Sequence, residues 1–445
     1  MKKIVFTLCL LTAIIFKTQS QELPQKIDSL LLSYAKINRF NGTALVYKKG
    51  KVILEKGYGY QDIKNKVPNT PNTIFQVGSI TKQFTATVIL KLAEENKLTL
   101  QDKLTKYFPD YPRGNEITIE HLLSHTSGIY EYFRNPLYHQ WKEKKLLTKE
   151  DRIALFKDKP MDFNPGTAFS YCNSGYELLG LIIEKITHKP YERVVDEMIL
   201  KPLKMVDSGF DFIGLKSSLK AKPYSLYSKD KTIEAIPWDF TSTYAAGSLY
   251  SNAKDMYLWH QGLLKGKIIK RESLEKAYTP LLNGYGYGWW IESLYDKRIV
   301  AHGGNVDGFT SQFTRVPEDD ICIVLLNNTY NHEIETIGNS ILAILYNKPY
   351  KILDGISLSN DSLKKYEGAY EVNSDYHVII SIAENRLYAQ INNEPKFELF
   401  AQNSESFFSK EEDLRMKFKS DNSTDFNKIS VFRGLNTKRG TKVYK

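Results

Sequence analysis

The sequence has 445 residues, of which 42% are hydrophobic and 25% charged, proportions that indicate a folded globular protein and exclude a disordered one. Three cysteines are too few for a disulfide framework or a cysteine-rich metal module, and the formal net charge of +10 raises the question of nucleic-acid binding. No block of five basic residues stands out, and most Lys and Arg are interleaved with Asp and Glu. These features argue against a nucleic-acid partner and place the basic surplus on a solvated surface.

The first 20 residues have the pattern of a secretory signal peptide. A basic Met-Lys-Lys start is followed by an apolar run over residues 4–16, and small residues precede a cleavage position after Ser20. Because this run is too short to cross a bilayer comfortably, we expect cleavage and export to the periplasm or the cell exterior. Cleavage removes three lysines and no acid, which lowers the net charge to +7.

Strand and helix patterns follow one another along the next 325 residues or so. Helical periodicity occurs at 25–38, after Ser79 with one apolar face, and at 334–346. Strand patterns occur at 43–48, 51–56, 288–293, 298–302, 311–316 and 321–327, with a hairpin signal at Lys49-Gly50. Both ends of this region therefore supply antiparallel strands, and its centre is largely helical. The pattern predicts an α+β fold, in which one antiparallel sheet is flanked by helices and carries a helical insertion.

The C-terminal part of the chain changes character. Residues 348–358 are predicted to be a linker, and short alternating runs follow at 377–382, 386–391, 397–400, 406–409, 415–418 and 428–432. Polar turns separate these runs, which predicts a small all-β module, either a barrel or a sandwich. The predicted organisation is a signal peptide over 1–20, one large domain over 21–347, a linker over 348–358 and a β module over 359–445.

Ser79 and Lys82 place a hydroxyl and an amine three residues apart at the start of a predicted helix. The helix N-terminus and burial both disfavour a charged ammonium, so this lysine could act as a base toward the serine. Spacing alone is weak support, because six other serines have a lysine three residues on: Ser33, Ser217, Ser228, Ser251, Ser273 and Ser362.

Two further motifs distinguish Ser79 from the other serines. Tyr171-Cys-Asn173 and His302-Gly-Gly304 follow it in this order. The ordered set resembles the serine hydrolases of the penicillin-binding protein and class C β-lactamase superfamily, which carry Ser-x-x-Lys, Tyr-x-Asn and Lys/His-x-Gly. Stretches at 122–129, 245–251 and 284–290 also resemble family segments, and the resemblance covers roughly residues 25–346. The C-terminal module resembles, at 366–370 and 395–400, the lipocalin-like β-barrel appended to some of these hydrolases.

The resemblance implies catalytic roles for three residues. Ser79 would be the nucleophile that attacks a carbonyl and forms an acyl-enzyme. Lys82 and Tyr171 would share the serine proton and deliver it to the leaving group. Either of them could be the base, and the sequence does not decide between them.

The resemblance also implies a substrate-binding set. Asn173 would bind the substrate amide and hold the lysine, and the backbone N–H groups of Ser79 and Asn305 would form an oxyanion hole. Gly303 and Gly304 fit a strand against which substrate backbone lies closely. His302 stands where efficient β-lactamases of this class usually have lysine, and histidine is charged only near or below a pKa of about 6.5. A motif with histidine at this position resembles that of D,D-carboxypeptidases, D-aminopeptidases and related esterases more closely than that of efficient β-lactamases.

Other candidate groups give weaker signals. His121 and His125 are four residues apart but lack a third ligand in the sequence, so we expect no metal and no cofactor. Cys172 and Cys322 remain after signal cleavage, and whether they pair is left open. The aromatic residues at 285–290 either line a substrate cleft or pack in the core.

We therefore expect an exported serine hydrolase that cleaves an amide or ester of a small molecule or peptide. Peptidoglycan-derived D-amino-acid peptides are the first substrate class and small esters the second. The alternatives are a class C-type β-lactamase and a catalytically silent penicillin-binding-like protein. We expect no nucleic-acid partner and no membrane span after signal cleavage, and the oligomeric state stays open.

Overall fold

The computed structural model describes residues 23–141, 146–227, 232–330, 333–350, 356–409, 414–420, 426–433 and 436–443. The predicted signal peptide lies outside these residues, as does part of the predicted linker. The chain divides into two compact units. The sheet unit comprises Asn41–Ser225 and Glu234–Tyr330, and the barrel unit comprises the described parts of Met1–Phe40, Leu226–Ile233 and Asn331–Lys445.

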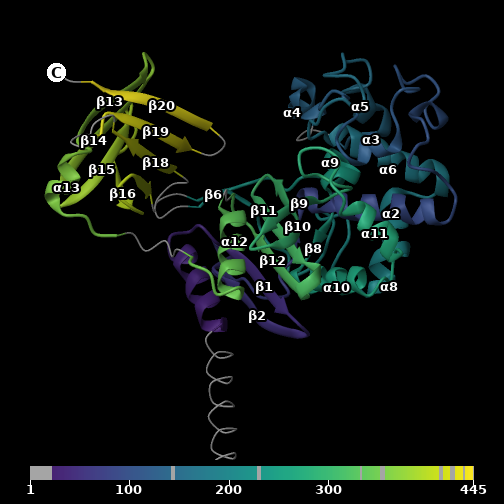
Figure 1. The fold of residues 1–445 in the computed structure, drawn as a ribbon, viewed down its shortest axis with the longest axis horizontal. Helices are drawn as coiled ribbons and strands as arrows, with labels where there is room; N and C mark the ends of the chain where they lie inside the picture. Colours follow the sequence, from purple (N-terminus) through teal and green to yellow (C-terminus); the bar gives the residue numbers. More distant parts are fainter. Residues whose placement is uncertain are drawn as a thin grey trace, which may run out of the picture. The chain divides into compact units, whose positions relative to one another are not determined.

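A six-stranded antiparallel sheet forms the centre of the sheet unit, in the order β2-β1-β12-β11-β10-β9 (Figure 1). Its strands are β1 (Gly42–Lys48), β2 (Lys51–Tyr58), β9 (Trp290–Leu294), β10 (Lys297–Val306), β11 (Phe309–Val316) and β12 (Ile321–Asn327). Lys49 and Gly50 have φ values of 47° and 79°, which suit the tight turn of the β1–β2 hairpin. Because β1 pairs with β12, strands from both ends of the predicted domain meet in one sheet, and the α+β prediction is confirmed.

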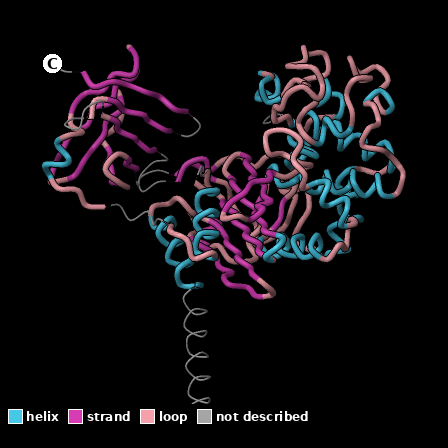
Figure 2. The backbone as a smooth tube through the Cα atoms, viewed as in Figure 1, coloured by secondary structure: helices cyan, strands magenta, loops and turns pink. Residues whose placement is uncertain are grey.

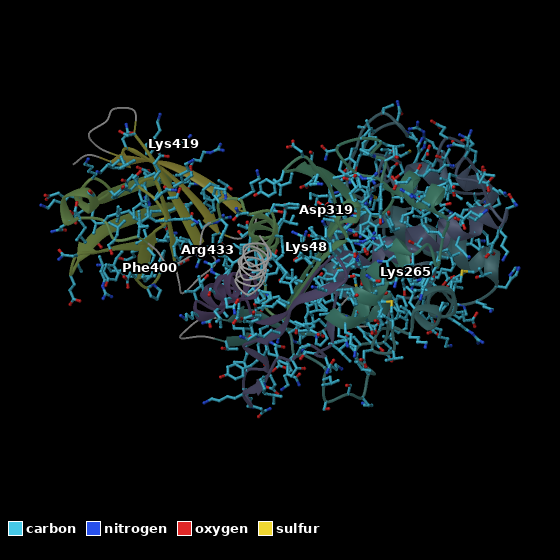
Figure 3. The ribbon with its side chains drawn as sticks, turned by 60° about the horizontal axis from the view of Figure 1, so that its bottom comes forward. Lys48, Lys265, Asp319, Phe400, Lys419 and Arg433 are labelled. Carbon is cyan, nitrogen blue, oxygen red and sulfur yellow. The ribbon has the colours of Figure 1, made fainter. Side chains whose placement is uncertain are left out.

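Burial along the strands follows their position in the sheet. Every residue of β11 and β12 is buried, whereas the edge strand β2 has exposed residues along its length. This explains why 321–326 is a continuous apolar run and 51–56 is not. Lys48 and Asp319 mark one end of the sheet, where β1 ends and the turn between β11 and β12 lies (Figure 3).

Helices and the loops between them separate β2 from β9 in the sequence of the sheet unit. They are α2 (Thr81–Glu94), α3 (Ile119–Leu123), α4 (Pro136–Trp141), α5 (Lys149–Ala154), α6 (Asn173–Thr187), α7 (Tyr191–Val195), α8 (Lys201–Leu203), α9 (Phe240–Gly247), α10 (Ala253–Leu264) and α11 (Arg271–Ala277). The expectation that α2 has a single buried face is wrong, since 11 of its 14 residues are buried. The reason is that α6, α7, α9 and α11 all contact it.

Short segments connect these elements. They are β3 (Tyr60–Asp62), β4 (Val67–Pro68), β5 (Phe75–Gln76), β6 (Tyr224–Tyr227), β7 (Thr232–Glu234), β8 (Tyr250–Ser251), and the single turns η1 (Gly78–Ile80), η2 (Leu104–Lys106), η3 (Tyr132–Arg134), η4 (Asp196–Leu200) and η5 (Pro317–Asp319). β5 pairs with β8, which brings the chain after α9 next to the turn that contains Ser79.

The barrel unit contains a closed barrel of eight antiparallel strands. They are β13 (Gly368–Asn373), β14 (Tyr376–Ala383), β15 (Arg386–Ile391), β16 (Phe397–Ala401), β17 (Ser406–Ser409), β18 (Leu414–Lys419), β19 (Lys428–Arg433) and β20 (Asn436–Val443). Pairing of β13 with β20 closes the ring, and Figure 2 shows that strand dominates this part of the chain. The same unit contains helices at residues 23–36, α12 (Ile334–Leu345) and α13 (Asn360–Lys364).

Alternating side chains fill the barrel. Val378 and Ile380 of β14 are buried, and Leu387, Ala389 and Ile391 of β15 are buried beside them. Residues between these positions are more exposed. This alternation confirms the all-β barrel prediction. Within the described residues, no helix combines the length and apolar character that a membrane span requires.

Candidate active site

Ser79 lies in a turn that the sheet holds from one side. It is the second residue of η1, directly before α2. Val77, two residues before Ser79, donates its N–H to Leu249 O at 2.9 Å and accepts a hydrogen bond from Ser311 Oγ through its carbonyl oxygen at 2.8 Å. These contacts tie the turn to β11 and to the chain after α9, while the Ser79 side chain stays partly exposed. A serine in such a position can be reached by a substrate.

Lys82 lies beneath Ser79 and is fully buried. Its Nζ atom is 3.0 Å from Ser79 Oγ, 2.8 Å from Asn173 Oδ1 and 2.7 Å from the carbonyl oxygen of Ala246. The asparagine opens α6 and Ala246 belongs to α9, so three separate elements meet at the lysine nitrogen. Side chains that are 91 residues apart in the sequence are thereby brought together.

The environment of Lys82 favours its neutral form. Burial lowers the pKa of Lys82 from 10.5 to about 7, although the charge of Glu131 acts in the opposite direction. A lysine with a pKa near neutrality has an unprotonated amine in a large fraction of molecules at physiological pH. Its amine is therefore available to accept a proton from a neighbouring hydroxyl.

Tyr171 lies beside the same pair. Lys82 Nζ is 4.8 Å from the centre of the Tyr171 ring, and the buried Tyr171 hydroxyl forms no well-aligned hydrogen bond with any described residue. Burial raises the pKa of Tyr171 well above its ordinary value of 10.0, although the nearby Ser79 hydroxyl lowers it in part. The phenol is thus protonated at neutral pH. Of the two base candidates, the lysine is the one whose environment favours the proton-accepting form.

A histidine holds the loop that carries Tyr171. His125 Nδ1 accepts the backbone N–H of Cys172 at 3.0 Å, and its ring lies 4.3 Å from the Tyr171 ring. His125 is buried, which together with the Lys82 charge lowers its pKa well below 6.5. It therefore acts on this loop as a neutral ring. The expectation of no metal pair with His121 stays a prediction, but His121 uses its Nδ1 to accept from Thr118 N at 3.3 Å.

The backbone of β10 packs directly on the turn that carries Ser79. Gly78 has φ +55°, and a Cβ atom placed on it would lie 2.7 Å from Asn305 N. A Cβ on Gly304 would lie 1.9 Å from Val77 O, so this glycine is required by the turn itself rather than by a substrate. Gly303 is partly exposed beside it. The backbone N–H of Asn305 thus lies next to Gly78, which precedes the serine, and its part in an oxyanion hole stays a prediction.

His302 faces the site from β10 as a neutral ring. Its Nδ1 lies 2.6 Å from Gly303 O and its Nε2 lies 3.0 Å from the Tyr285 hydroxyl. A carbonyl only accepts, so Nδ1 carries the proton and Nε2 accepts from the tyrosine. Burial, assisted by the charge of Lys82, lowers the pKa of His302 to about 3. A cationic role toward a substrate carboxylate therefore lacks support in this geometry.

Two groups at the site have no counterpart in the sequence prediction. Glu131 accepts the backbone N–H of Asn173 in a short hydrogen bond and the Asn173 Nδ2 at 3.2 Å. Ala246 supplies a backbone carbonyl, which leaves no side-chain signal. Glu131 does leave a sequence signal. It is an acid within the apolar and aromatic run Ile129-Tyr-Glu131-Tyr-Phe133, two residues after the family-like stretch at 122–129.

The aromatic run at 285–290 divides between the site and the core. Tyr285 bonds to His302, and its ring is 4.8 Å from the half-buried Trp290, which lies 5.7 Å from Phe169. Tyr287 and Trp289 are buried in the main core. Tyr285, Trp290 and Phe169 thus form an apolar wall beside the histidine.

The two cysteines that follow the predicted signal peptide are buried. Cys172 and Cys322 are both buried free thiols, and Cys172 Sγ donates to Ile129 O at 3.2 Å. Burial raises the pKa of both thiols above 9.0. Within the described ranges, no group of three His, Cys, Asp or Glu side chains could hold a metal ion.

The fold and this constellation can be compared with known proteins. A family model described as "Beta-lactamase" matches residues 28–344. The "Putative penicillin-binding protein PbpX" of Bacillus subtilis (strain 168) is 31% identical over 74% of this chain and 81% of its own length. "Protein flp" of Staphylococcus aureus is 33% identical over 68% of this chain and 63% of its own length. The chain belongs to the beta-lactamase family, a family of serine hydrolases.

Solved structures extend the comparison. The octameric penicillin-binding protein homologue from Pyrococcus abyssi aligns over 93% of this chain and 99% of its own, with 27% identity and a TM-score of 0.69. The D-amino acid amidase from Ochrobactrum anthropi SV3 aligns over 73% of this chain and 99% of its own, with 21% identity and a TM-score of 0.65. The second likeness concerns the fold alone.

Proposed function

We propose that this protein cleaves amide or ester bonds through an acyl-enzyme on Ser79, with Lys82 as the general base. The observation that carries the proposal is the set of partners around Lys82 Nζ. A neutral amine has two N–H donors and one lone pair. The Asn173 and Ala246 oxygens accept both hydrogens at 2.8 and 2.7 Å, so the lone pair points at Ser79 Oγ, 3.0 Å away.

The reaction then follows from the placement of these groups. Ser79 Oγ attacks the substrate carbonyl carbon while its proton passes to Lys82. The backbone N–H groups of Ser79 and Asn305 stabilise the resulting oxyanion. Tyr171, held protonated by burial, donates to the departing nitrogen or oxygen and recovers its proton from Lys82. The carbon–leaving-group bond breaks, and water hydrolyses the acyl-enzyme by the reverse proton path.

The electrostatics of the site favour one substrate class. Recognition of a substrate carboxylate, as in D,D-carboxypeptidase or β-lactam chemistry, calls for a nearby cation. Neutral His302 does not supply one, and the wall of Tyr285, Trp290 and Phe169 is apolar. We therefore place D-amino-acid amides, D-aminopeptidase-type peptides and small esters ahead of substrates that end in a free carboxylate. The D-stereochemistry rests on the names of the amidase neighbours.

Export belongs to the same proposal. It rests on the signal-peptide pattern of residues 1–20, and it would give the enzyme access to peptidoglycan-derived peptides. The chain would then work in the periplasm or outside the cell without a resident cofactor.

A substrate panel tests the proposal. Wild-type protein and Ser79→Ala are assayed on a D-alanine anilide, a nitrophenyl ester, an acyl-D-Ala-D-Ala peptide and a chromogenic cephalosporin. We expect Ser79-dependent turnover of the first two above the last two. Ser273→Ala is the matched control, because it removes the serine of another Ser-x-x-Lys, on α11, and should retain full activity. Equal activity in wild type and Ser79→Ala would overturn the mechanism, and fast cephalosporin turnover would favour a β-lactamase.

A further inference from the structure

Glu131 is a half-buried carboxylate whose polar neighbours are hydrogen-bond donors. Its Oε1 accepts Phe133 N at 3.0 Å and Asn173 Nδ2 at 3.2 Å, and its Oε2 accepts Asn173 N. A carboxylate accepts at both oxygens, whereas a neutral amide would turn an NH₂ group toward one of these N–H groups. The surroundings of Glu131 therefore select an acid at this position.

We infer that Glu131 is a positioning residue, whose carboxylate sets the orientation of the Asn173 amide and thereby aims the Lys82 lone pair at Ser79. The inference deepens the proposed function and rests on it. It names a group that does not touch the substrate in this account but acts through Asn173.

The orientation step follows from donor and acceptor types. Because Glu131 only accepts, Asn173 must turn its NH₂ group toward the carboxylate, and its Oδ1 then faces Lys82. With the amide reversed, the lysine would meet an NH₂ donor in place of an acceptor. The neutral amine would then direct its lone pair at Asn173 and away from Ser79. Lys82 would then be unable to accept the Ser79 proton, although its side chain is intact.

The charge of Glu131 also acts on Lys82. It raises the pKa of Lys82 and so opposes the larger lowering by burial, which leaves the value at about 7. The other titratable groups that face the lysine are Tyr171, Cys172, Tyr176, His125 and His302. Burial shifts the pKa of each toward its neutral form. Burial also raises the pKa of Glu131, but the three N–H groups that its oxygens accept favour the carboxylate, so Glu131 is the neighbour whose charge can be removed.

Glu131→Gln is the test variant and Glu177→Gln its matched control. Glu177 is fully buried and lies on α6, and its carboxylate accepts from Arg152 Nε at 2.6 Å. Two quantities are measured on the full mature chain: kcat/KM against pH on a nitrophenyl ester, and the titration midpoint of Lys82 by NMR of ¹³C-labelled lysine. The Lys82 signal is identified by its loss in Lys82→Met.

In Glu131→Gln we expect the Lys82 midpoint and the acid limb of kcat/KM to move down by about one pH unit. The plateau rate should fall by up to about 100-fold, as for other misplaced catalytic groups. Glu131→Asp retains the charge but withdraws the carboxylate by one methylene, so it should keep the midpoint and lose plateau rate. Glu177→Gln should lower the melting temperature and leave the midpoint in place.

Two results would overturn the inference. One is a Lys82 midpoint that is unchanged in Glu131→Gln or that moves equally in Glu177→Gln. The other is a plateau value of kcat/KM in Glu131→Asp that equals that of wild type, together with an unchanged dependence of kcat/KM on pH in Glu131→Gln. If wild-type protein hydrolyses none of the substrates, the proposed function fails, and the NMR midpoint alone decides the role of Glu131. If Glu131→Gln does not melt cooperatively, Glu131→Asp decides the orientation step.

Discussion

The barrel and the sheet unit bury different kinds of residue. The barrel core consists of apolar side chains such as Val378, Leu387 and Met416, and Ser409 is the one buried polar residue among those described between 356 and 443. The sheet unit buries Lys82, Gln83 and many other polar groups. A buried amine or amide costs free energy unless it is hydrogen-bonded, so each of these groups needs particular partners in the fold.

The barrel core and the surroundings of Lys82 should also tolerate different substitutions. In the barrel, side chains of suitable size on alternate positions are sufficient, because apolar burial is not directional. Around Lys82, each neighbour must supply a particular atom, as Asn173 Oδ1 and the Ala246 carbonyl do. We therefore expect substitutions in the barrel to alter stability and substitutions around the lysine to alter chemistry.

The largest expected effect is on Lys82. Lys82→Ala removes the proposed base and should reduce kcat/KM on a nitrophenyl ester by at least about 10²–10⁴-fold. Lys91→Ala is the control, since this lysine belongs to the last turn of the same helix and is partly exposed. Retention of wild-type activity in Lys82→Ala, measured with a matched melting curve, would mean that another group accepts the serine proton.

Ile380 tests the other side of the comparison. Ile380→Ala removes a side chain that is 1% exposed in the barrel core and should lower the free energy of unfolding by about 2–5 kcal/mol. Ile379→Ala, on the same strand but 47% exposed, should change it by less than about 0.5 kcal/mol. Denaturant unfolding measures both, and ester turnover should be unchanged in each. A matching loss of turnover in Ile380→Ala would show that the barrel supports the site.

The pH profile gives the next effect in size. Because burial lowers the pKa of Lys82 to about 7, its neutral form increases as pH rises through neutrality. On a nonionisable ester, kcat/KM should rise about tenfold per pH unit below the midpoint and flatten above it. Melting temperatures over the same range control for unfolding. An acid limb centred above pH 9 would place the lysine near its ordinary pKa and contradict this assignment.

The smallest effect is expected at Cys172. Its thiol is buried and its pKa is raised by burial, so it is a poor nucleophile despite its place between Tyr171 and Asn173. Cys172→Ala should retain turnover within a few-fold. Thiol titration should find Cys172 and Cys322 free, slow to react in native protein and fast in denaturant. A disulfide between them, or loss of activity in Cys172→Ala with an unchanged melting temperature, would contradict this.

Parts of the fold could be predicted because local periodicity decides them. The β1–β2 hairpin, the run at 321–327 and six barrel strands all have a regular apolar pattern. The strands β13 and β20 were missed. β20 contains Lys438, Arg439 and Lys442 and has no regular apolar pattern; it forms a hairpin with β19, and its second pairing, with β13, closes the barrel. Closure is a long-range property that no short window of sequence contains.

Some features of the candidate site could likewise be predicted from the sequence and others could not. Side chains in ordered motifs, such as Ser79, Lys82 and Asn173, could be identified from sequence, and the structure brings them within hydrogen-bonding distance. The charge state of His302 could not, because it depends on burial in the folded protein. Glu131 and the Ala246 carbonyl act through tertiary contacts. The acid within an aromatic run is a sequence signal that does not by itself name a role, and a backbone carbonyl leaves no signal.

Intact-mass measurement of the acyl-enzyme tests the central claim most directly. Mature wild-type protein, Ser79→Ala and Lys82→Ala are mixed with an activated acyl ester and quenched at short times. The intact mass gives the number of acyl groups, and digestion of a second sample locates them. The account predicts one acyl group in wild type, located on the peptide that contains Ser79, none in Ser79→Ala and slow appearance in Lys82→Ala. Equal labelling of wild type and Ser79→Ala, or an acyl group on another residue, would contradict it.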